Sequence, residues 1–426
     1  MSTFRIVGGA PLSGSFTPAG NKNGALPILA ACLLTSDTVR VENVPDIQDV
    51  RTLLTIIESL GVSVAWVEPN VVELCAADAD GARLDPDLAG GIRGSVLLAG
   101  PMLARFGAIE LPEPGGDFIG RRRLDTHLLA LRSLGAEVEV GQGFILRTKG
   151  LVGQEIFLDE PSVTGTENAV LAAVTAEGHT ELRNAASEPH VQDLCRFLVE
   201  LGARIEGIGT NTLSIDGVES LHGGTFRIGA DHIEIGSIIG LAAATRSNLR
   251  ITEVDRSAFD PLRVGFQRLG IEFEWRDGEL VVLGEGALEI QPDVGDQIPK
   301  VDDGPWPAFP ADLISIALVT ATQCRGTVLV HEKMFESRMF FVDKLVTMGA
   351  QIVLCDPHRA VVVGPSRLLG RRLESPDIRA GMAMLIAALA AEGESTIDNI
   401  QQIERGYERI DERLTALGAS IERVTA

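Results

Sequence analysis

The stretch LLTIIESLGVSVAW, residues 53–66, contains the pattern that decides the fold. Apolar residues at helical spacing predict a helix with one buried face, and the residues after Gly61 alternate as in a half-buried strand. A glycine between the two suits a left-handed cap at the end of the helix. The same arrangement recurs in HLLALRSLGAEVEV, LCRFLVELGARIEG, LRVGFQRLGIEFEW, FVDKLVTMGAQIVL and IDERLTALGASIER.

The six copies make the chain a repeat protein. Their glycines, 74, 67, 68, 79 and 69 residues apart, are Gly61, Gly135, Gly202, Gly270, Gly349 and Gly418. Ahead of the copies lie helices rich in alanine and poor in charge, such as AGMAMLIAALA, which we expect to be buried on most sides. Each unit is therefore predicted to contain two helices and about four strands. A period of about 70 residues is too long for a common solenoid, and six units divide naturally into two domains of three.

Composition and charge limit the class of protein. The 426 residues are 45% hydrophobic and 23% charged, as expected of a globular protein, and exceed what one compact core usually holds. No apolar run reaches the roughly 18 residues of a membrane-spanning helix, and the start, MSTFRIVGGA, does not resemble a signal peptide. Five scattered cysteines indicate reduced thiols rather than disulfides or a zinc site, so we expect a cytoplasmic protein.

The net charge of −22 argues against nucleic acid or an anionic membrane as the main partner. A small anionic substrate would need a locally basic site. No glycine-rich motif has the spacing of a P-loop or a dinucleotide-binding turn, which argues against a nucleotide-binding enzyme of those classes.

Three segments contain candidate catalytic or binding residues, and each also has a purely structural interpretation. In AGNKNGALP (19–27), Lys22 and Asn23 lie in a turn just before the first buried helix, either as an anion site or as an ordinary cap with an exposed lysine. In LPEPGGDFIGRRRLDTH (111–127), Asp117 precedes three arginines, in either a mobile lid or a solvated basic loop. In DDGPWPAFPADL (302–313), Asp312 lies at the start of an apolar helix, either as a base or as a helix cap.

Further arginines stand out in a chain this acidic. Arg379 and Arg405 come close to predicted helix starts, where anions are favoured, and Arg338 is similar. Each alone is more easily explained as structural. If the repeats face each other, one anionic ligand could meet a set of six cations: Lys22, Arg93, Arg122, Arg338, Arg379 and Arg405.

These motifs together resemble the UDP-N-acetylglucosamine 1-carboxyvinyltransferase (enolpyruvyl transferase) family across essentially the whole chain. The resemblance is carried by GNKNGALPILAA, AGPMLARFG, GGDFIGRRRLDTH, SVTGTEN, PAFPADL, FESR and IERGYERI. The related shikimate-pathway family would show a Lys-Ser start in place of NKN. The resemblance implies an α/β fold, a two-domain inside-out α/β barrel of six βαβαββ-like units. One domain would hold residues 22–232 with a mobile loop at 111–123, and the other 1–21 plus 233–426, with a cleft that closes on substrate.

The resemblance also implies the reaction and its partners. The enolpyruvyl group of phosphoenolpyruvate would pass to the 3-hydroxyl of UDP-N-acetylglucosamine by addition and elimination, with release of phosphate and without metal or cofactor. This is the first committed step of peptidoglycan synthesis, and so serves cell-wall biogenesis, cell shape and cell division. An alternative is transfer to another uridine-containing acceptor in secondary metabolism, and a second class is a non-catalytic protein that senses UDP-sugars.

Residue roles follow from matching the family's motifs. Lys22, Arg122 and Arg405 match ligands of phosphoenolpyruvate. Asn23 and Asp312 match residues at the sugar, with Asp312 as its base, and Arg93 and Arg379 match supporting residues. The uridine and diphosphate would lie at Leu124, Asp125, His127, Ser162, Val163 and Thr164. Ile235 and Gly236 are weaker candidates for the cleft lining.

Three positions depart from the family's usual pattern. Asp117 replaces a cysteine, which implies fosfomycin resistance because a carboxylate opens that drug's epoxide poorly. Arg123 replaces a proline, and Leu97 replaces an aromatic residue. The last two bear on the nucleotide-sugar side, although Arg123 remains a candidate ligand there.

Overall fold

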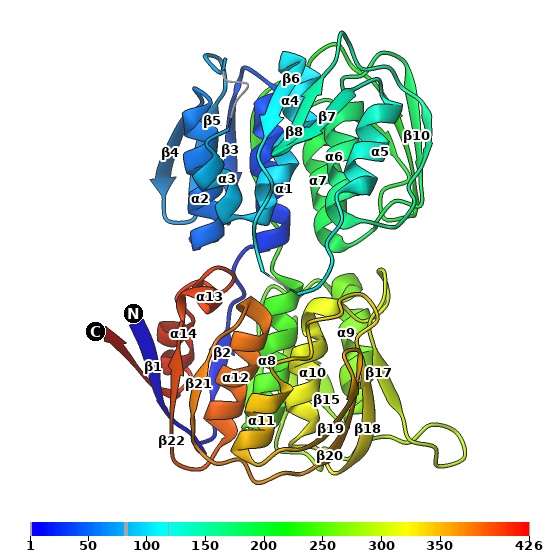
Figure 1. The fold of residues 1–426 in the computed structure, drawn as a ribbon. Coiled ribbons are helices and arrows are strands. Elements are labelled where there is room, and N and C mark those ends of the chain that lie inside the picture. Colours follow the sequence, from blue (N-terminus) through cyan, green and yellow to red (C-terminus); the bar gives the residue numbers. More distant parts are fainter. Residues whose placement is uncertain (1, 81–83, 118, 426) are drawn as a thin grey trace. The chain divides into compact units, whose positions relative to one another are not determined.

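The chain forms two compact units in the computed structural model, which describes residues 2–80, 84–117 and 119–425 (Figure 1). Unit 1 consists of Met1–Ala19, Phe118–Arg121 and Ala230–Ala426, and unit 2 of Gly20–Asp117 and Arg122–Gly229. The chain therefore begins in unit 1, builds unit 2 and returns.

The six predicted helix–glycine–strand copies are confirmed. Each glycine has a φ between +80 and +110°, the left-handed conformation that ends a helix without steric cost only when no Cβ is present. The helices are α2 (Gln48–Ser59), α5 (Asp125–Ser133), α7 (Pro189–Glu200), α9 (Arg256–Arg268), α11 (Val342–Met348) and α14 (Ile410–Ala416). The strands that follow them are β4 (Ser63–Glu68), β7 (Glu137–Gly141), β11 (Arg204–Glu206), β15 (Glu272–Arg276), β19 (Gln351–Asp356) and β23 (Ser420–Thr425).

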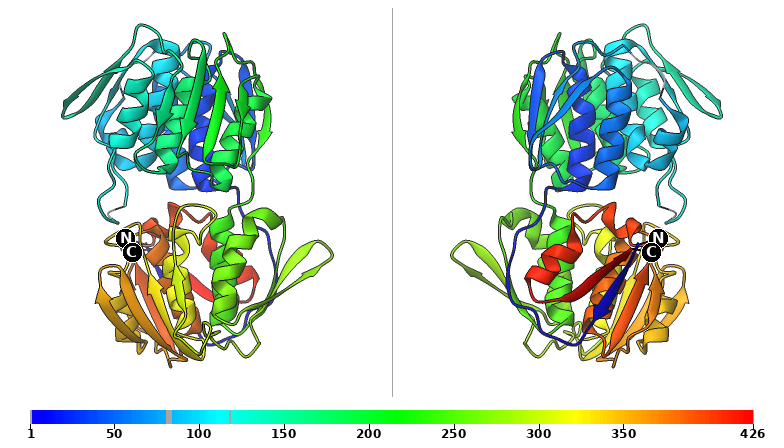
Figure 2. Two further views of the ribbon diagram at one scale, coloured as in Figure 1. Left: turned by 90° about the vertical axis from the view of Figure 1, so that its right-hand side faces the viewer. Right: turned by 90° about the vertical axis from the view of Figure 1, so that its left-hand side faces the viewer.

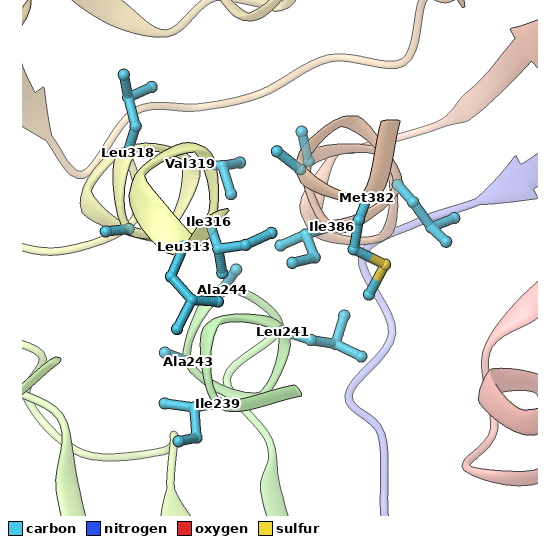
Figure 3. Close-up of a cluster of buried hydrophobic side chains, with 14 of the residues drawn as sticks. Ile239, Leu241, Ala243, Ala244, Leu313, Ile316, Leu318, Val319, Met382 and Ile386 are labelled. Atoms are coloured by element: carbon cyan, nitrogen blue, oxygen red, sulfur yellow. The ribbon is translucent and has the colours of Figure 1, made fainter. Parts of the chain in front are cut away.

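A second set of helices forms the centre of each unit. They are α1 (Lys22–Ala31), α4 (Ala99–Phe106) and α6 (Val163–Ala173) in unit 2, and α8 (His232–Ala244), α10 (Ile314–Ala321) and α12 (Ile378–Ala390) in unit 1. Every residue of α8 and α10 is buried, as their small and apolar composition predicts. Figure 3 shows the three central helices of unit 1 packed side by side. Gly240 permits the close approach, because a Cβ there would lie 2.5 Å from Ile316 Cγ2.

Sheets of three or four strands pack around these helices. In unit 2 the strand orders are β13 (Gly224–Arg227)–β3 (Thr38–Glu42)–β5 (Val71–Cys75)–β4, then β6 (Ala108–Leu111)–β8 (Gly143–Arg147)–β7, then β11–β12 (Thr212–Asp216)–β10 (His179–Arg183)–β9 (Glu155–Phe157). In unit 1 they are β15–β16 (Glu279–Leu283)–β14 (Asn248–Ile251)–β2 (Gly14–Phe16), then β17 (Lys300–Asp302)–β18 (Gly326–His331)–β20 (Arg359–Gly364)–β19, then β21 (Arg372–Glu374)–β22 (Glu394–Asp398)–β1 (Ser2–Val7)–β23.

Five sheets have the four strands expected per repeat, and each combines one parallel pair with two antiparallel pairs. The sheet of the second repeat has three strands within the described residues, all antiparallel. The short helices are η1 (Cys32–Leu34), α3 (Pro86–Gly91), η2 (Arg93–Leu98), η3 (Ala311–Leu313) and α13 (Gln401–Glu404).

Each unit has its own hydrophobic core between its sheets and helices. Strand residues alternate between buried and exposed, as in β3 and β22, so one face of each sheet packs inward. The side views show sheets at the outside of each unit, with further helices beside them at the surface (Figure 2). Within the described ranges, no helix has both the length and the apolar character needed to cross a membrane.

Candidate active site

The first candidate group lies where α1 begins in unit 2. The Asn21 side chain caps the helix by accepting the Gly24 N–H at 3.1 Å, so Lys22 and Asn23 are the first helical residues and not, as predicted, part of a turn before it. Lys22 Nζ lies 2.6 Å from Asp49 Oδ2, and both side chains are buried. The plainer reading of Lys22 as an exposed lysine is therefore wrong. Sequence reasoning missed Asp49, although an acidic residue in the first turn of α2 was a possible signal.

Arginines gather next to this group in the same unit. Arg93 Nη2 donates to the backbone carbonyl oxygens of Arg122 at 2.7 Å and Arg123 at 3.3 Å. Burial lowers the pKa of Arg93 to about 10, and the nearby Arg122 guanidinium contributes to that lowering. Glu113 acts in the opposite direction on Arg93, and a bound anion would favour its charged form further.

The predicted nucleotide residues cluster around the first turns of α5 and α6. Leu124 precedes α5 and Asp125 begins it, while Ser162 caps α6 by accepting the Gly165 N–H at 3.2 Å and Val163 follows as its first residue. Arg123, the position that departs from the family, pairs with Asp159 at 2.8 Å and with Asp125 at 3.3 Å.

His127 is fixed in one tautomer by its neighbours. Asn168 Oδ1 accepts the Gly100 N–H at 2.8 Å, so its Nδ2 is the donor to Val96 O and to His127 Nδ1, both at 2.9 Å. His127 Nδ1 is then an acceptor, and Nε2 carries the hydrogen toward Thr164 Oγ1 at 3.0 Å. Burial, and then the charge of Arg93, lower the pKa of His127 to about 3. The imidazole is therefore neutral at physiological pH, and sequence reasoning did not identify Asn168 as its partner.

In the predicted loop, Leu111 ends β6, and the described residues 112–117 and 119–123 form no helix or strand. Gly116 and Gly120 have φ values of +103° and +133°, conformations that suit glycine. The Arg121 N–H donates to Glu336 Oε2 at 3.1 Å, and Ile119 O accepts the Ser337 N–H at 3.1 Å, all within unit 1. Phe118, the other apolar residue predicted at the loop tip, lies outside the described residues. The mobile lid stays a prediction.

A carboxylate held by two arginines dominates the candidate group in unit 1. Asp312 lies in η3 directly before α10, as predicted. Its Oδ1 accepts from Arg338 Nη2 at 2.8 Å, and its Oδ2 accepts from Arg379 Nε at 3.1 Å and lies 3.0 Å from Nη2. Asp312 is 27% exposed, whereas the arginines are 3% and 6% exposed. The carboxylate is thus held in one orientation by its two arginine partners and remains open to a ligand.

The positive charge of Arg379 is itself stabilised by neighbouring groups. Burial would lower its pKa, but Tyr407, Asp312 and Asp231 together raise it above its usual value. Its guanidinium lies 5.3 Å from the centre of the Tyr407 ring, whose hydroxyl bonds Ser237 Oγ at 2.8 Å. Arg379 is the second residue of α12, near a helix start as predicted.

The other positions predicted in this unit are Arg405, Ile235 and Gly236. Arg405 follows the last residue of α13, with Nη1 donating to Gln402 Oε1 at 3.0 Å, so its predicted place near a helix start is wrong. Ile235 and Gly236 are both buried within α8. His232, at the start of α8, was missed. Burial lowers its pKa to about 4, and of two nearby charges, Asp312 raises it and Arg379 lowers it.

Comparison with known proteins defines the class. The family of EPSP synthase (3-phosphoshikimate 1-carboxyvinyltransferase) matches residues 6–414. The enolpyruvyl transferase NikO from Streptomyces tendae has a similar structure, with a TM-score of 0.87 and 26% identity over 100% of this chain and 99% of that one. EPSP synthase from Acinetobacter baumannii shares the fold, with a TM-score of 0.76 at 17% identity over both complete chains. The predicted fold class is therefore confirmed: this is an enzyme with the enolpyruvyl transferase fold.

Curated relatives narrow the family. A UDP-N-acetylglucosamine 1-carboxyvinyltransferase of Bradyrhizobium diazoefficiens is 60% identical over 99% of this chain and 98% of its own length. Proteins of the same name in Treponema denticola and Treponema pallidum are 54% and 53% identical over 99% of both chains. The chain belongs to the UDP-N-acetylglucosamine 1-carboxyvinyltransferase family, as the sequence motifs predicted.

Proposed function

We propose that the chain transfers the enolpyruvyl group of phosphoenolpyruvate to the 3-hydroxyl of UDP-N-acetylglucosamine, with release of phosphate. Full-length identity of 60% to a relative of that name supports this acceptor. The structural observation that carries the proposal is Asp312, an accessible carboxylate held between two buried guanidinium groups. In this proposal the reaction takes place in the cytoplasm, as the first committed step of peptidoglycan synthesis.

The chemistry requires an acid and a base. A proton is delivered to the methylene carbon of phosphoenolpyruvate, which makes the adjacent carbon electrophilic. The sugar oxygen then bonds to that carbon while its proton leaves to a base. In the second step a proton leaves the new methyl group as the carbon–oxygen bond to phosphate breaks. We assign the acid to Asp117 and the base to Asp312, whose fixed orientation suits general base catalysis.

Phosphoenolpyruvate needs cations, and we assign Lys22, Arg122 and Arg405 as its ligands. The mutual repulsion between Arg122 and Arg93 supports this, because a bound anion would relieve it. Arg93 and Arg379 are supporting residues in this proposal, since each orients a group the reaction uses. Arg338 belongs with them because it holds Asp312.

The nucleotide sugar is assigned mainly to the first turns of α5 and α6. Two helix starts offer backbone N–H groups to a diphosphate. The neutral, buried His127 has both ring nitrogens bonded, and its bond to Thr164 fixes that hydroxyl at the start of α6. We place Asn23 at the sugar, and the uridine and diphosphate at Arg123, Leu124, Asp125, His127, Ser162, Val163 and Thr164.

Phosphate release tests the proposal directly. The protein would be mixed with phosphoenolpyruvate and either UDP-N-acetylglucosamine or UMP, and free phosphate and the acceptor's mass gain would be followed. We expect release with the nucleotide sugar and a product heavier by the enolpyruvyl group. Release with UMP alone would move the assignment to another acceptor, and release with neither would contradict the proposed activity.

A further inference from the structure

Two buried carboxyl groups lie near Arg338, apart from its contact with Asp312. Asp303 follows β17 and Glu332 follows β18, and neither is exposed at all. These strands pair in parallel, with Asp302 opposite His331, so the next residue of each strand lies at the same edge of the sheet. Two carboxyl groups without water are costly unless they are paired or protonated.

Each carboxyl group has one well-bonded oxygen. Glu332 Oε1 accepts the N–H groups of Met334 at 3.1 Å and Phe335 at 3.0 Å, and Asp303 Oδ1 accepts the Lys333 N–H at 2.5 Å. These bonds fix the turn at 332–335, which leads directly to Arg338. The carboxyl groups therefore determine where the backbone carrying Arg338 lies.

The second oxygen of each group lacks a hydrogen bond. Asp303 Oδ2 and Glu332 Oε2 are buried and without a hydrogen-bond partner among the described residues. Asp303 is near enough to raise the pKa of Glu332, which favours a proton on one of the two carboxyl groups. A single proton between them would satisfy both oxygens and remove one of two buried charges.

Arg338 connects this pair to the reaction. Its Nε lies 3.5 Å from Glu332 Oε2 without forming a hydrogen bond, while its Nη2 bonds Asp312 Oδ1 at 2.8 Å. The Arg338 guanidinium thus forms a weak ion pair with Glu332 and a stronger one with Asp312. A second negative charge on the pair would draw Arg338 away from Asp312.

We infer that Asp303 and Glu332 share one proton and act as positioning residues that hold Arg338 against Asp312. This inference rests on the proposed function, because it takes Asp312 as the base. Neither residue touches the reacting atoms, so their effect is on the orientation of Asp312. Loss of the shared proton at alkaline pH should lower turnover.

Other charged and titratable groups near the pair act on it less directly. Burial raises the pKa of Glu332 to about 9, with Arg338 lowering it and Asp303 raising it. The His358 Nδ1 faces the Glu332 backbone oxygen at 2.8 Å, and Lys333 Nζ is paired with Asp302. The groups on the surrounding elements are Asp302, Asp312, His331, Lys333, Arg338 and His358.

The first test compares turnover against pH in wild type, Glu332→Gln and Asp303→Asn. The amide introduced by Glu332→Gln would imitate the protonated acid, so we expect kcat within about threefold of wild type at neutral pH and no alkaline fall from this pair. Asp303→Asn would remove a carboxylate that helps to raise the pKa of Glu332, so we expect the alkaline fall in kcat to begin at a lower pH than in wild type, with little change in either KM. Glu234→Gln is the control, because that buried carboxylate pairs with Arg413 and does not contact Asp312. Its pH profile should keep the wild-type shape.

The second test does not use activity. The infrared difference between wild type and Glu332→Gln at neutral pH should contain the carbonyl stretch of a protonated carboxylic acid. Absence of that band, or an alkaline limb in Glu332→Gln identical to that of wild type, would overturn the inference. If the band were present but the wild type released no phosphate, the proposed function would fail while the shared proton stood.

Discussion

At the scale of single residues, Asp312 distinguishes catalysis from simple helix capping. Its position before an apolar helix was predictable from PAFPADL, but its two arginine partners come from residues 26 and 67 positions away. Sequence patterns report local spacing, so they cannot show which distant cations converge on a carboxylate. The same reason explains why Asp49, Asn168 and His232 were missed.

Asp312→Asn keeps the shape of the side chain but cannot accept the sugar's proton. We expect turnover to fall by about 10²–10⁴-fold in a protein that still folds, with a lower melting temperature because two buried guanidinium groups lose their charged partner. A residue that only caps the helix would instead show normal turnover and a small stability loss. Measuring both quantities on one preparation separates the two readings.

Asp117→Cys tests the loop acid. Either side chain can deliver a proton, so the variant should remain active, but a thiolate is a far better nucleophile toward the fosfomycin epoxide. We expect time-dependent inactivation and a drug adduct by intact mass in Asp117→Cys only, and loss of most turnover in Asp117→Ala. An adduct on Asp117 in the wild type, or full activity of Asp117→Ala, would sink the assignment.

At the scale of elements, the repeats were the most predictable feature because each is encoded locally. An apolar helix face, a glycine and an alternating strand lie within 14 residues of sequence, and all six copies form as expected. Helix starts were less predictable. Asn21 and not Lys22 provides the cap of α1, and the short α13 places Arg405 at a helix end.

Two of the repeat glycines provide a matched pair for the cost of a side chain. Gly418, at φ +99°, has open space where a methyl group would lie, whereas at Gly270, φ +80°, the methyl would lie 2.3 Å from the backbone oxygen of Glu289. We expect Gly418→Ala to cost about 1–2 kcal/mol from backbone strain alone. Gly270→Ala should cost clearly more, because a backbone carbonyl must also move. Urea unfolding measures both, and equal losses would contradict this account.

The turn after β18 should make stability depend on pH. The pKa of Glu332 is raised by burial from 4.5 to about 9, so between these values the folded state holds a proton that the unfolded state has released. Stability from this group is therefore complete below about pH 4.5 and is lost as pH rises toward 9, at no more than about 1.4 kcal/mol per pH unit. Glu332→Gln lacks this dependence. Its unfolding free energy should match wild type in acid and exceed it increasingly toward pH 9, and a constant difference would contradict the raised pKa.

At the scale of the whole molecule, the cations proposed as ligands belong to a strongly acidic chain. The net charge is −22, yet the arginines and lysine proposed as ligands come from both units and from widely separated repeats. Composition predicted that any anion site must be locally basic. Only the full-length resemblance indicated which of the 37 Lys and Arg residues those are, because no short-range pattern marks them.

Arg122→Ala in unit 2 and Arg405→Ala in unit 1 test whether both units serve the same small anion. Each removes a charge-assisted bond worth roughly 1.5–3 kcal/mol, so kcat/KM for phosphoenolpyruvate should fall by about 10–150-fold. Binding of UDP-N-acetylglucosamine in the absence of phosphoenolpyruvate should change little.

Surface arginines provide the controls. Arg147→Ala in unit 2 removes an exposed pair with Glu139, and Arg367→Ala in unit 1 removes an exposed pair with Glu392. These controls should keep wild-type kinetics because exposed pairs contribute little. If only one of the two ligand variants impaired phosphoenolpyruvate use, the anion site would belong to that unit alone, and the assignment of the other arginine would be wrong.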